Sequence, residues 1–121
     1  MPIINLKTLI KSFKYAIKGI RYTFRHEQNF RIQSFIALVV VIFMFVFEIS
    51  RGEAVILFLL ILLVLVLELI NTTLEKVVDI LKPRIHHYVE VIKDLMAAMV
   101  FLASLGSLII GILIFWPYIF S

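Results

Sequence analysis

The feature that most constrains this fold is a set of three long apolar runs in a short chain. Residues 32–47, 54–67 and 95–120 contain no charged side chain, and together they make up nearly half of the 121 residues. Overall, 63% of the chain is hydrophobic and 17% is charged. A soluble domain of this size has too little interior to bury so much apolar surface. The sequence therefore predicts an all-α integral membrane protein with one membrane domain over residues 1–121.

The lengths of the runs predict how often the chain crosses the bilayer. A helix needs about 20 mainly apolar residues to cross roughly 30 Å of hydrocarbon. We expect crossings over 32–49, 54–79 and 95–118, with a polar turn at 48–53 and a polar connection at 80–94 in which Pro83 breaks the helix. The second crossing must continue past residue 67 into a cytoplasmic extension, because fourteen helical residues span only about 21 Å.

An interfacial amphipathic helix is expected ahead of the first crossing, within residues 1–30. Its apolar and basic residues each recur every three or four positions, on different faces. The apolar set is Leu6, Leu9, Ile10, Phe13, Ile17, Ile20 and Phe24, and the basic set is Lys7, Lys11, Lys14, Lys18, Arg21 and Arg25. This pattern is typical of an anionic membrane surface, not of nucleic-acid binding. A helix packed on a soluble core stays an alternative, although nothing else in the chain could supply that core.

The distribution of Lys and Arg predicts the orientation. Residues 1–31 hold seven of the twelve, the first turn holds only Arg51, and residues 76–93 hold four. By the positive-inside rule the N-terminus and the second connection are cytoplasmic, and the first turn and the C-terminus are outside. Trp116 and Tyr118 would then anchor the last crossing at the outer interface. We expect a multi-pass membrane protein with its N-terminus in the cytoplasm.

One narrow polar stripe marks the second crossing. Glu68, Asn71, Glu75 and Asp79 follow one another at spacings of three, four and four. On a helix they fall within an arc of about 80°. Ionisable groups within a membrane segment are costly and usually functional. Holding neighbouring helices together is the alternative, but a single Asn or Thr would suffice for that, and acids on one stripe repel one another unless a cation is present.

The depth of the stripe indicates which kind of function it serves. If the hydrocarbon begins near residue 54, about 20 residues bring the helix to the cytoplasmic boundary near 72–74. Glu75 and Asp79 then lie at that boundary, with Glu68 a turn or two below it. Two further polar pairs share this level, Glu27 with Asn29 and Lys93 with Asp94. An ion channel or proton relay would instead need charges near the midplane or throughout the depth.

Carboxylates, a lysine and an amide at the headgroup level match the requirements of phosphoryl transfer from a nucleotide to a lipid hydroxyl. Carboxylates bind Mg²⁺ together with substrate phosphates, a lysine can bind a phosphate, and a further carboxylate can accept the hydroxyl proton. The chain has no cysteine, which excludes thiolate chemistry. It also has neither a P-loop nor a protein-kinase signature, so its nucleotide site would belong to neither class.

The stripe also carries a family resemblance. Residues 68–79, Glu-Leu-Ile-Asn-Thr-Thr-Leu-Glu-Lys-Val-Val-Asp, closely resemble the signature of the small bacterial diacylglycerol kinase family. Further matches are Lys18-Gly19-Ile20-Arg21, residues 27–31, His86, Lys93-Asp94 and Ala97-Ala98. The resemblance spans nearly the whole chain. It implies a homotrimer of three-crossing subunits with an interfacial N-terminal helix, which phosphorylates a membrane lipid with ATP and Mg²⁺ at active sites shared between subunits.

The resemblance implies roles for individual residues. Glu68 resembles the general base that takes the proton from the lipid hydroxyl, and Glu27 and Glu75 match the carboxylates that bind Mg²⁺ between the ATP phosphates. The residues that match the family's catalytic pocket are Asn71, Lys93 and Asp94. Those that match the lining of the nucleotide site are Asp79, Lys93 and Asp94, and the remaining nucleotide contacts match Tyr15 and His86. Two positions depart from the family pattern: Thr8 stands where some members have Arg, and Ala97 stands where some have Ser.

Two patterns resemble the Gram-positive branch of the family, whose usual substrate is undecaprenol, a C55 polyprenol. They are residues 27–32, Glu-Gln-Asn-Phe-Arg-Ile, and the Lys82-Pro83-Arg84 connection with His86. We therefore expect an ATP- and Mg²⁺-dependent kinase that makes undecaprenyl phosphate. A diacylglycerol kinase that makes phosphatidic acid is the alternative, and the smaller or apolar side chains of Thr8 and Ala97 favour the polyprenol. A non-enzymatic membrane scaffold or ion-binding protein is the third possibility.

Overall fold

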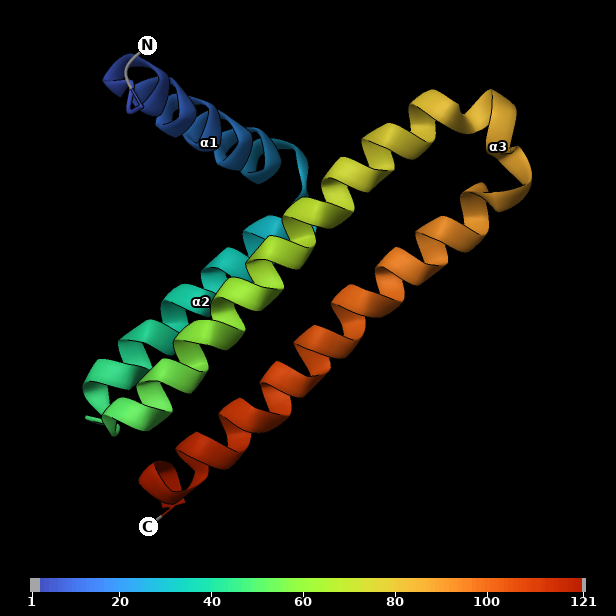
Figure 1. Ribbon diagram of the computed structural model, residues 1–121. Coiled ribbons are helices and arrows are strands. Elements are labelled where there is room, and N and C mark those ends of the chain that lie inside the picture. Colours follow the sequence, from blue (N-terminus) through green and yellow to red (C-terminus); the bar gives the residue numbers. More distant parts are fainter. Residues whose placement is uncertain (1–2, 121) are drawn as a thin grey trace.

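The computed structural model describes residues 3–120, and within this range the chain is helical, with no strand. Three helices follow in order: α1 (Leu6–His26), α2 (Gln28–Val46) and α3 (Arg51–Phe120). In Figure 1, α2 lies beside the first part of α3, the rest of α3 turns back along it, and α1 projects away at one end. The predicted all-α class is confirmed.

Helix α1 is amphipathic and largely unpacked. The side chain of Asn5 caps its N-terminus by accepting bonds from the backbone N–H groups of Lys7 (3.0 Å) and Thr8 (3.3 Å). Thr23 is its one buried residue. The apolar side chains of Leu6, Phe13 and their companions on that face are exposed, as expected for a helix that faces a membrane surface instead of a protein core.

A single extended residue separates α1 from α2. Glu27 has φ −115° and ψ 112°, so α1 ends at His26, earlier than the expected limit of residue 30. The guanidinium of Arg31 donates from Nη1 to the carbonyl oxygens of Phe24 (2.9 Å) and Arg25 (3.0 Å), which have lost their helical partners. These bonds fix the direction in which α1 leaves α2.

The expected polar turn after the first apolar helix is present. Helix α2 ends at Val46, and Glu48 adopts the left-handed conformation with φ 48°. Ser50 and Glu53 then form a capping box at the start of α3: Ser50 Oγ accepts from the Glu53 N–H (3.2 Å), and Glu53 Oε1 accepts from the Ser50 N–H (3.2 Å). The turn is therefore fixed by local hydrogen bonds.

Helix α3 is 70 residues long and is kinked at Ile85, where φ is −119° and ψ is 23°. We call residues 51–84 its first arm and residues 86–120 its second arm. Each arm is about 50 Å long at 1.5 Å per residue, more than the roughly 30 Å of bilayer hydrocarbon. The polar connection expected at 80–94 is thus helical except at Ile85. Pro83 removes one backbone donor, which is enough for a kink nearby but not for a loop.

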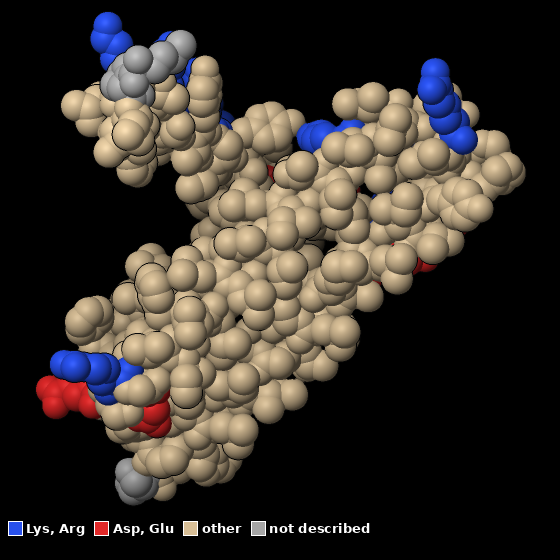
Figure 2. Space-filling view, viewed as in Figure 1, with Lys and Arg blue, Asp and Glu red and all other residues tan. Residues whose placement is uncertain are grey.

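The surface of this fold is mainly apolar. The buried hydrophobic residues are Phe30, Leu57, Val64, Val78, Met96 and Phe115, while many large apolar side chains on α2 and α3 are exposed. Figure 2 shows charged side chains gathered at the ends of the molecule and an uncharged body between them. Both α2 and α3 are long and apolar enough to cross a membrane. The fold therefore fits a bilayer as its solvent.

Candidate active site

The Glu68 carboxylate lies at the centre of the site. Glu68 is only 3% exposed, although it is an acid on an otherwise apolar helix. Its carbonyl accepts a hydrogen bond from Thr72 Oγ1 (3.0 Å), but none of the side-chain hydrogen bonds within residues 3–120 reaches its carboxylate. An acid on a residue with so little exposure, without a side-chain donor, is costly for stability, so its presence points to a chemical role.

Two more acids belong to the surroundings of Glu68. The charges of Glu27 and Glu75 both act on the Glu68 carboxylate. Glu75 follows Glu68 on the same face of α3, whereas Glu27 belongs to the junction between α1 and α2. Because the Glu27 side chain makes no capping bond to α2, its carboxylate stays available to the cluster. These three acids are the residues expected to serve as the base and as the two Mg²⁺ ligands, and their charges interact in the folded chain.

An ion pair links the two arms of α3 beside this cluster. Lys93 Nζ lies 3.2 Å from Asp79 Oδ1, and the two side chains are 43% and 55% exposed. A pair this exposed contributes roughly 0–1 kcal/mol to stability, so its main effect is to bring Lys93 to the level of the stripe. Asn71 is half-buried and lines a small cavity with Met96 and Met99 of the second arm.

Three expected site residues lie apart from the cluster in the single chain. Tyr15 is exposed on α1, His86 is exposed next to the kink, and Asp94 is exposed on the second arm. Across residues 3–120, no hydrogen bond or ion pair joins them to the carboxylates. The rings of His86 and His87 lie 3.9 Å apart, centroid to centroid.

Lys76 is a site residue that the sequence reasoning did not single out. Its Nζ lies 5.7 Å from the ring centroid of Tyr22 on α1, and the charges of Glu27 and Asp79 act on it. It therefore holds α1 near the stripe and adds positive charge among the acids. Its place directly after Glu75, within the family signature, is the signal that could have identified it.

The oxygen donors fit a Mg²⁺ ion that binds together with a nucleotide. Within the described part of the chain, no three His, Cys, Asp or Glu side chains are close enough to hold one metal ion. Mg²⁺ commonly uses only one or two protein carboxylates, and substrate phosphates and waters complete its octahedron. Glu27 and Glu75 can provide those two carboxylates, so the chain need not contain a complete metal cage.

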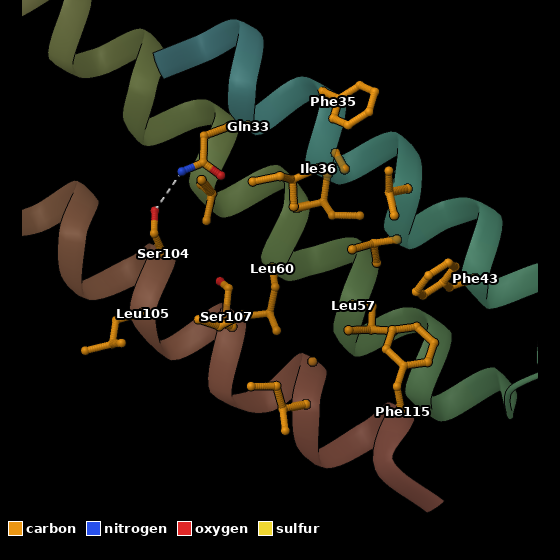
Figure 3. A pocket seen from close by; sticks show the side chains of 18 of the residues that line it. Gln33, Phe35, Ile36, Phe43, Leu57, Leu60, Ser104, Leu105, Ser107 and Phe115 are labelled. Carbon is orange, nitrogen blue, oxygen red and sulfur yellow. Dashed lines mark hydrogen bonds between the residues drawn. The ribbon is translucent and has the colours of Figure 1, made fainter. Parts of the chain in front are cut away.

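An apolar groove of about 930 Å³ lies between α2 and the two arms of α3 (Figure 3). Val64 on its wall lies one helical turn before Glu68 on the same face of α3. Apart from the indole of Trp116, the polar residues of the lining are Gln33, Ser104 and Ser107. The groove can hold a long hydrocarbon chain and lies next to the buried carboxylate.

Comparison with known proteins is consistent with this geometry. Residues 14–115 match the family described as prokaryotic diacylglycerol kinase. Over 113 residues the chain is 40% identical to an undecaprenol kinase of Bacillus subtilis, covering 93% of this chain and 92% of that protein. It is 34% identical over 114 residues to a diacylglycerol kinase of Synechocystis, covering 93% of this chain but only 65% of that relative's length. A diacylglycerol kinase of Haemophilus influenzae is 34% identical over 99 residues, which are 82% of this chain and 84% of that protein.

Proposed function

The chain belongs to the prokaryotic diacylglycerol kinase family and is a lipid kinase, and we propose that it transfers the γ-phosphate of ATP to the hydroxyl of undecaprenol. The observation that carries this proposal is the buried Glu68 carboxylate, one helical turn from a groove that can hold a lipid tail. This combination favours an enzyme over a non-enzymatic scaffold, because a scaffold has no need of an acid on a buried residue beside a lipid groove.

Glu68 acts as the general base. The lipid hydroxyl oxygen attacks the γ-phosphorus, the bond from that phosphorus to the β–γ bridging oxygen breaks, and ADP leaves. The hydroxyl proton passes to a Glu68 carboxylate oxygen. The burial of Glu68 supports this role, because a base kept from bulk water acts on the bound hydroxyl instead of on water.

The nucleotide binds on the cytoplasmic side of Glu68. Glu27 and Glu75 would hold Mg²⁺, which offsets the negative charge of the ATP phosphates when it is bound. Lys93 and Lys76 are cations at this level that can contact the phosphates. The remaining proposed contacts of the nucleotide and catalytic pocket are Asn71, Asp79, Asp94, Tyr15 and His86.

The working form is a homotrimer in the bacterial cytoplasmic membrane. Each subunit crosses three times, over residues 32–49, 54–79 and 95–118, with its N-terminus in the cytoplasm. Two observations support an assembly: large apolar side chains are exposed along α2 and α3, and Tyr15, His86 and Asp94 lie apart from the carboxylates in one chain. A neighbouring subunit can supply such residues to a shared site and cover part of that surface.

Undecaprenol is the preferred substrate in this proposal. A polyprenol has one hydroxyl and no other polar group, so an almost wholly apolar groove suits it. The Bacillus subtilis relative named undecaprenol kinase also matches this chain over nearly the full length of both. Diacylglycerol is the second candidate, because the other two relatives carry that name.

Turnover in mixed micelles tests both parts of the proposal. The purified protein receives Mg²⁺ and ATP with undecaprenol or diacylglycerol, and the catalytic efficiency is compared. We expect Mg²⁺-dependent turnover with a preference for undecaprenol. A clear preference for diacylglycerol would overturn the substrate assignment, and no turnover of either lipid would overturn the activity. A monomeric particle with full activity in mild detergent would contradict the trimer.

A further inference from the structure

One polar contact crosses the otherwise apolar groove. The amide nitrogen Nε2 of Gln33, on α2, donates to Ser104 Oγ, on the second arm of α3, at 3.1 Å (Figure 3). Both residues are half-buried and both line the groove. Hydrogen bonding between side chains 71 positions apart is unusual in this chain, whose other side-chain bonds are mostly local.

The hydrogen bond between Gln33 and Ser104 leaves two donor protons of the pair unused. It uses one of the two amide protons of Gln33 and a lone pair of Ser104, so a second amide proton and the serine hydroxyl proton remain. Ser107 lines the same groove but differs, because its hydroxyl already donates to the Ala103 carbonyl at 2.7 Å. Among the polar side chains of the groove, Gln33 and Ser104 are thus the pair that can serve a ligand.

The pair lies close to the place that the hydroxyl end of the acceptor lipid would occupy. Gln33 follows Glu27 by six residues, about 9 Å along α2, and the groove that it lines includes Val64, one helical turn before Glu68. The pair therefore lies between the carboxylate cluster and the apolar length of the groove. In diacylglycerol the ester carbonyls are only a few bonds from the hydroxyl, so a lipid whose hydroxyl reaches Glu68 brings its esters to this level.

We propose that the Gln33–Ser104 pair determines whether the enzyme accepts an ester-bearing lipid. The remaining protons of the pair donate to an ester carbonyl of diacylglycerol, which would otherwise be unpaired in the groove. A polyprenol has no ester carbonyl to accept these protons, and in its presence the pair keeps only its mutual hydrogen bond. The pair would thus allow the groove to take diacylglycerol as a second substrate beside undecaprenol. This inference rests on the proposed lipid kinase function.

The test is the ratio of kcat/KM for diacylglycerol to kcat/KM for undecaprenol in mixed micelles with Mg²⁺ and ATP. We expect Ser104→Ala and Gln33→Leu each to lower this ratio about tenfold, the effect of losing one or two neutral hydrogen bonds. Ser104→Thr keeps the hydroxyl and should preserve the ratio. Ser107→Ala is the matched control: it removes a hydroxyl from the same wall, but one already bonded within its own helix, so the ratio should stay within twofold.

The ratio separates specificity from a merely structural role, because damage to the fold lowers the turnover of both lipids in parallel. A ratio that is unchanged in Ser104→Ala and Gln33→Leu would overturn the inference, as would parallel losses on both lipids. A wild-type protein that turns over undecaprenol but no diacylglycerol would also overturn it, while leaving the proposed function intact. A wild-type protein that phosphorylates neither lipid would contradict the proposed function itself.

Discussion

Two carboxylates at different levels of the molecule differ sharply in their surroundings. At the turn between α2 and α3, Glu53 Oε1 accepts hydrogen bonds from the Ser50 N–H (3.2 Å), the Ser50 hydroxyl (3.0 Å) and the Tyr118 hydroxyl. Midway along the first arm, Glu68 is a buried residue whose carboxylate receives no side-chain donor from residues 3–120 and is acted on by the charges of Glu27 and Glu75. We expect the first arrangement to stabilise the fold and the second to serve the proposed reaction.

A hydrogen-bonded cluster of Ser50, Glu53 and Tyr118 joins the beginning of α3 to its end. The Tyr118 hydroxyl, followed by the Ser50 backbone, holds the pKa of Glu53 below its ordinary value, because both donors favour the charged carboxylate. The aromatic rings of Phe43 and Phe115 pack edge to face nearby, with centroids 5.9 Å apart. This end should contribute to stability and not to turnover, which the following variants test.

The largest effect is expected for Glu68→Gln. The amide keeps the size of the side chain but cannot accept the hydroxyl proton, so turnover should fall about 10²- to 10⁴-fold. Binding of ATP with Mg²⁺, measured by calorimetry, should change little, and the melting temperature should not fall, because a buried charge has been removed. Near wild-type turnover would contradict the assignment of the base.

A smaller effect, on binding as well as turnover, is expected for Glu75→Gln. Loss of this carboxylate removes one charged ligand from Mg²⁺, which should weaken the binding of ATP with Mg²⁺ about 10- to 100-fold. Glu53→Gln is the matched control, because it makes the same chemical change at the turn between α2 and α3 and should leave ATP binding unaltered. Equal effects of the two variants would contradict the distinction between these two regions.

The next largest effect is expected for Lys93→Met, which separates catalysis from stability near the kink of α3. Loss of the charge should raise the KM for ATP about tenfold, because Lys93 can no longer contact a phosphate. Since the Lys93–Asp79 pair is exposed, the free energy of unfolding should fall by less than about 1 kcal/mol. A large drop in melting temperature with an unchanged KM would show that the pair is only structural.

The smallest effect on activity is expected for Tyr118→Phe, which should keep kcat/KM within twofold and lower the melting temperature by a few degrees. The pKa of Glu53 is lowered in the folded protein, so its stabilisation is present above the pKa of the unfolded state. It is lost as the pH falls through the folded pKa, which lies below the ordinary value for a glutamate. The difference in melting temperature between wild type and variant should therefore shrink between pH 6 and pH 3, and a constant difference would refute the role of the Glu53 charge.

The sequence by itself determined the features that follow from helix geometry and solvent. The apolar runs required a membrane, and the spacing of Glu68, Asn71, Glu75 and Asp79 placed them on one helical face. The capping residues Ser50 and Glu53 also lie within the turn that the sequence predicted. These properties are local: the helix fixes the angle between neighbours a few residues apart, whatever packs around them.

Only the tertiary structure decided which distant groups meet. It brought Glu27 to the stripe through the extended residue between α1 and α2, joined Lys93 to Asp79 across the kink at Ile85, and set Gln33 against Ser104. It also showed that the polar connection at 80–94 stays helical except at that kink. Periodicity carries no information on such contacts, because they depend on how the backbone turns at Glu27 and Ile85 and on how whole helices pack.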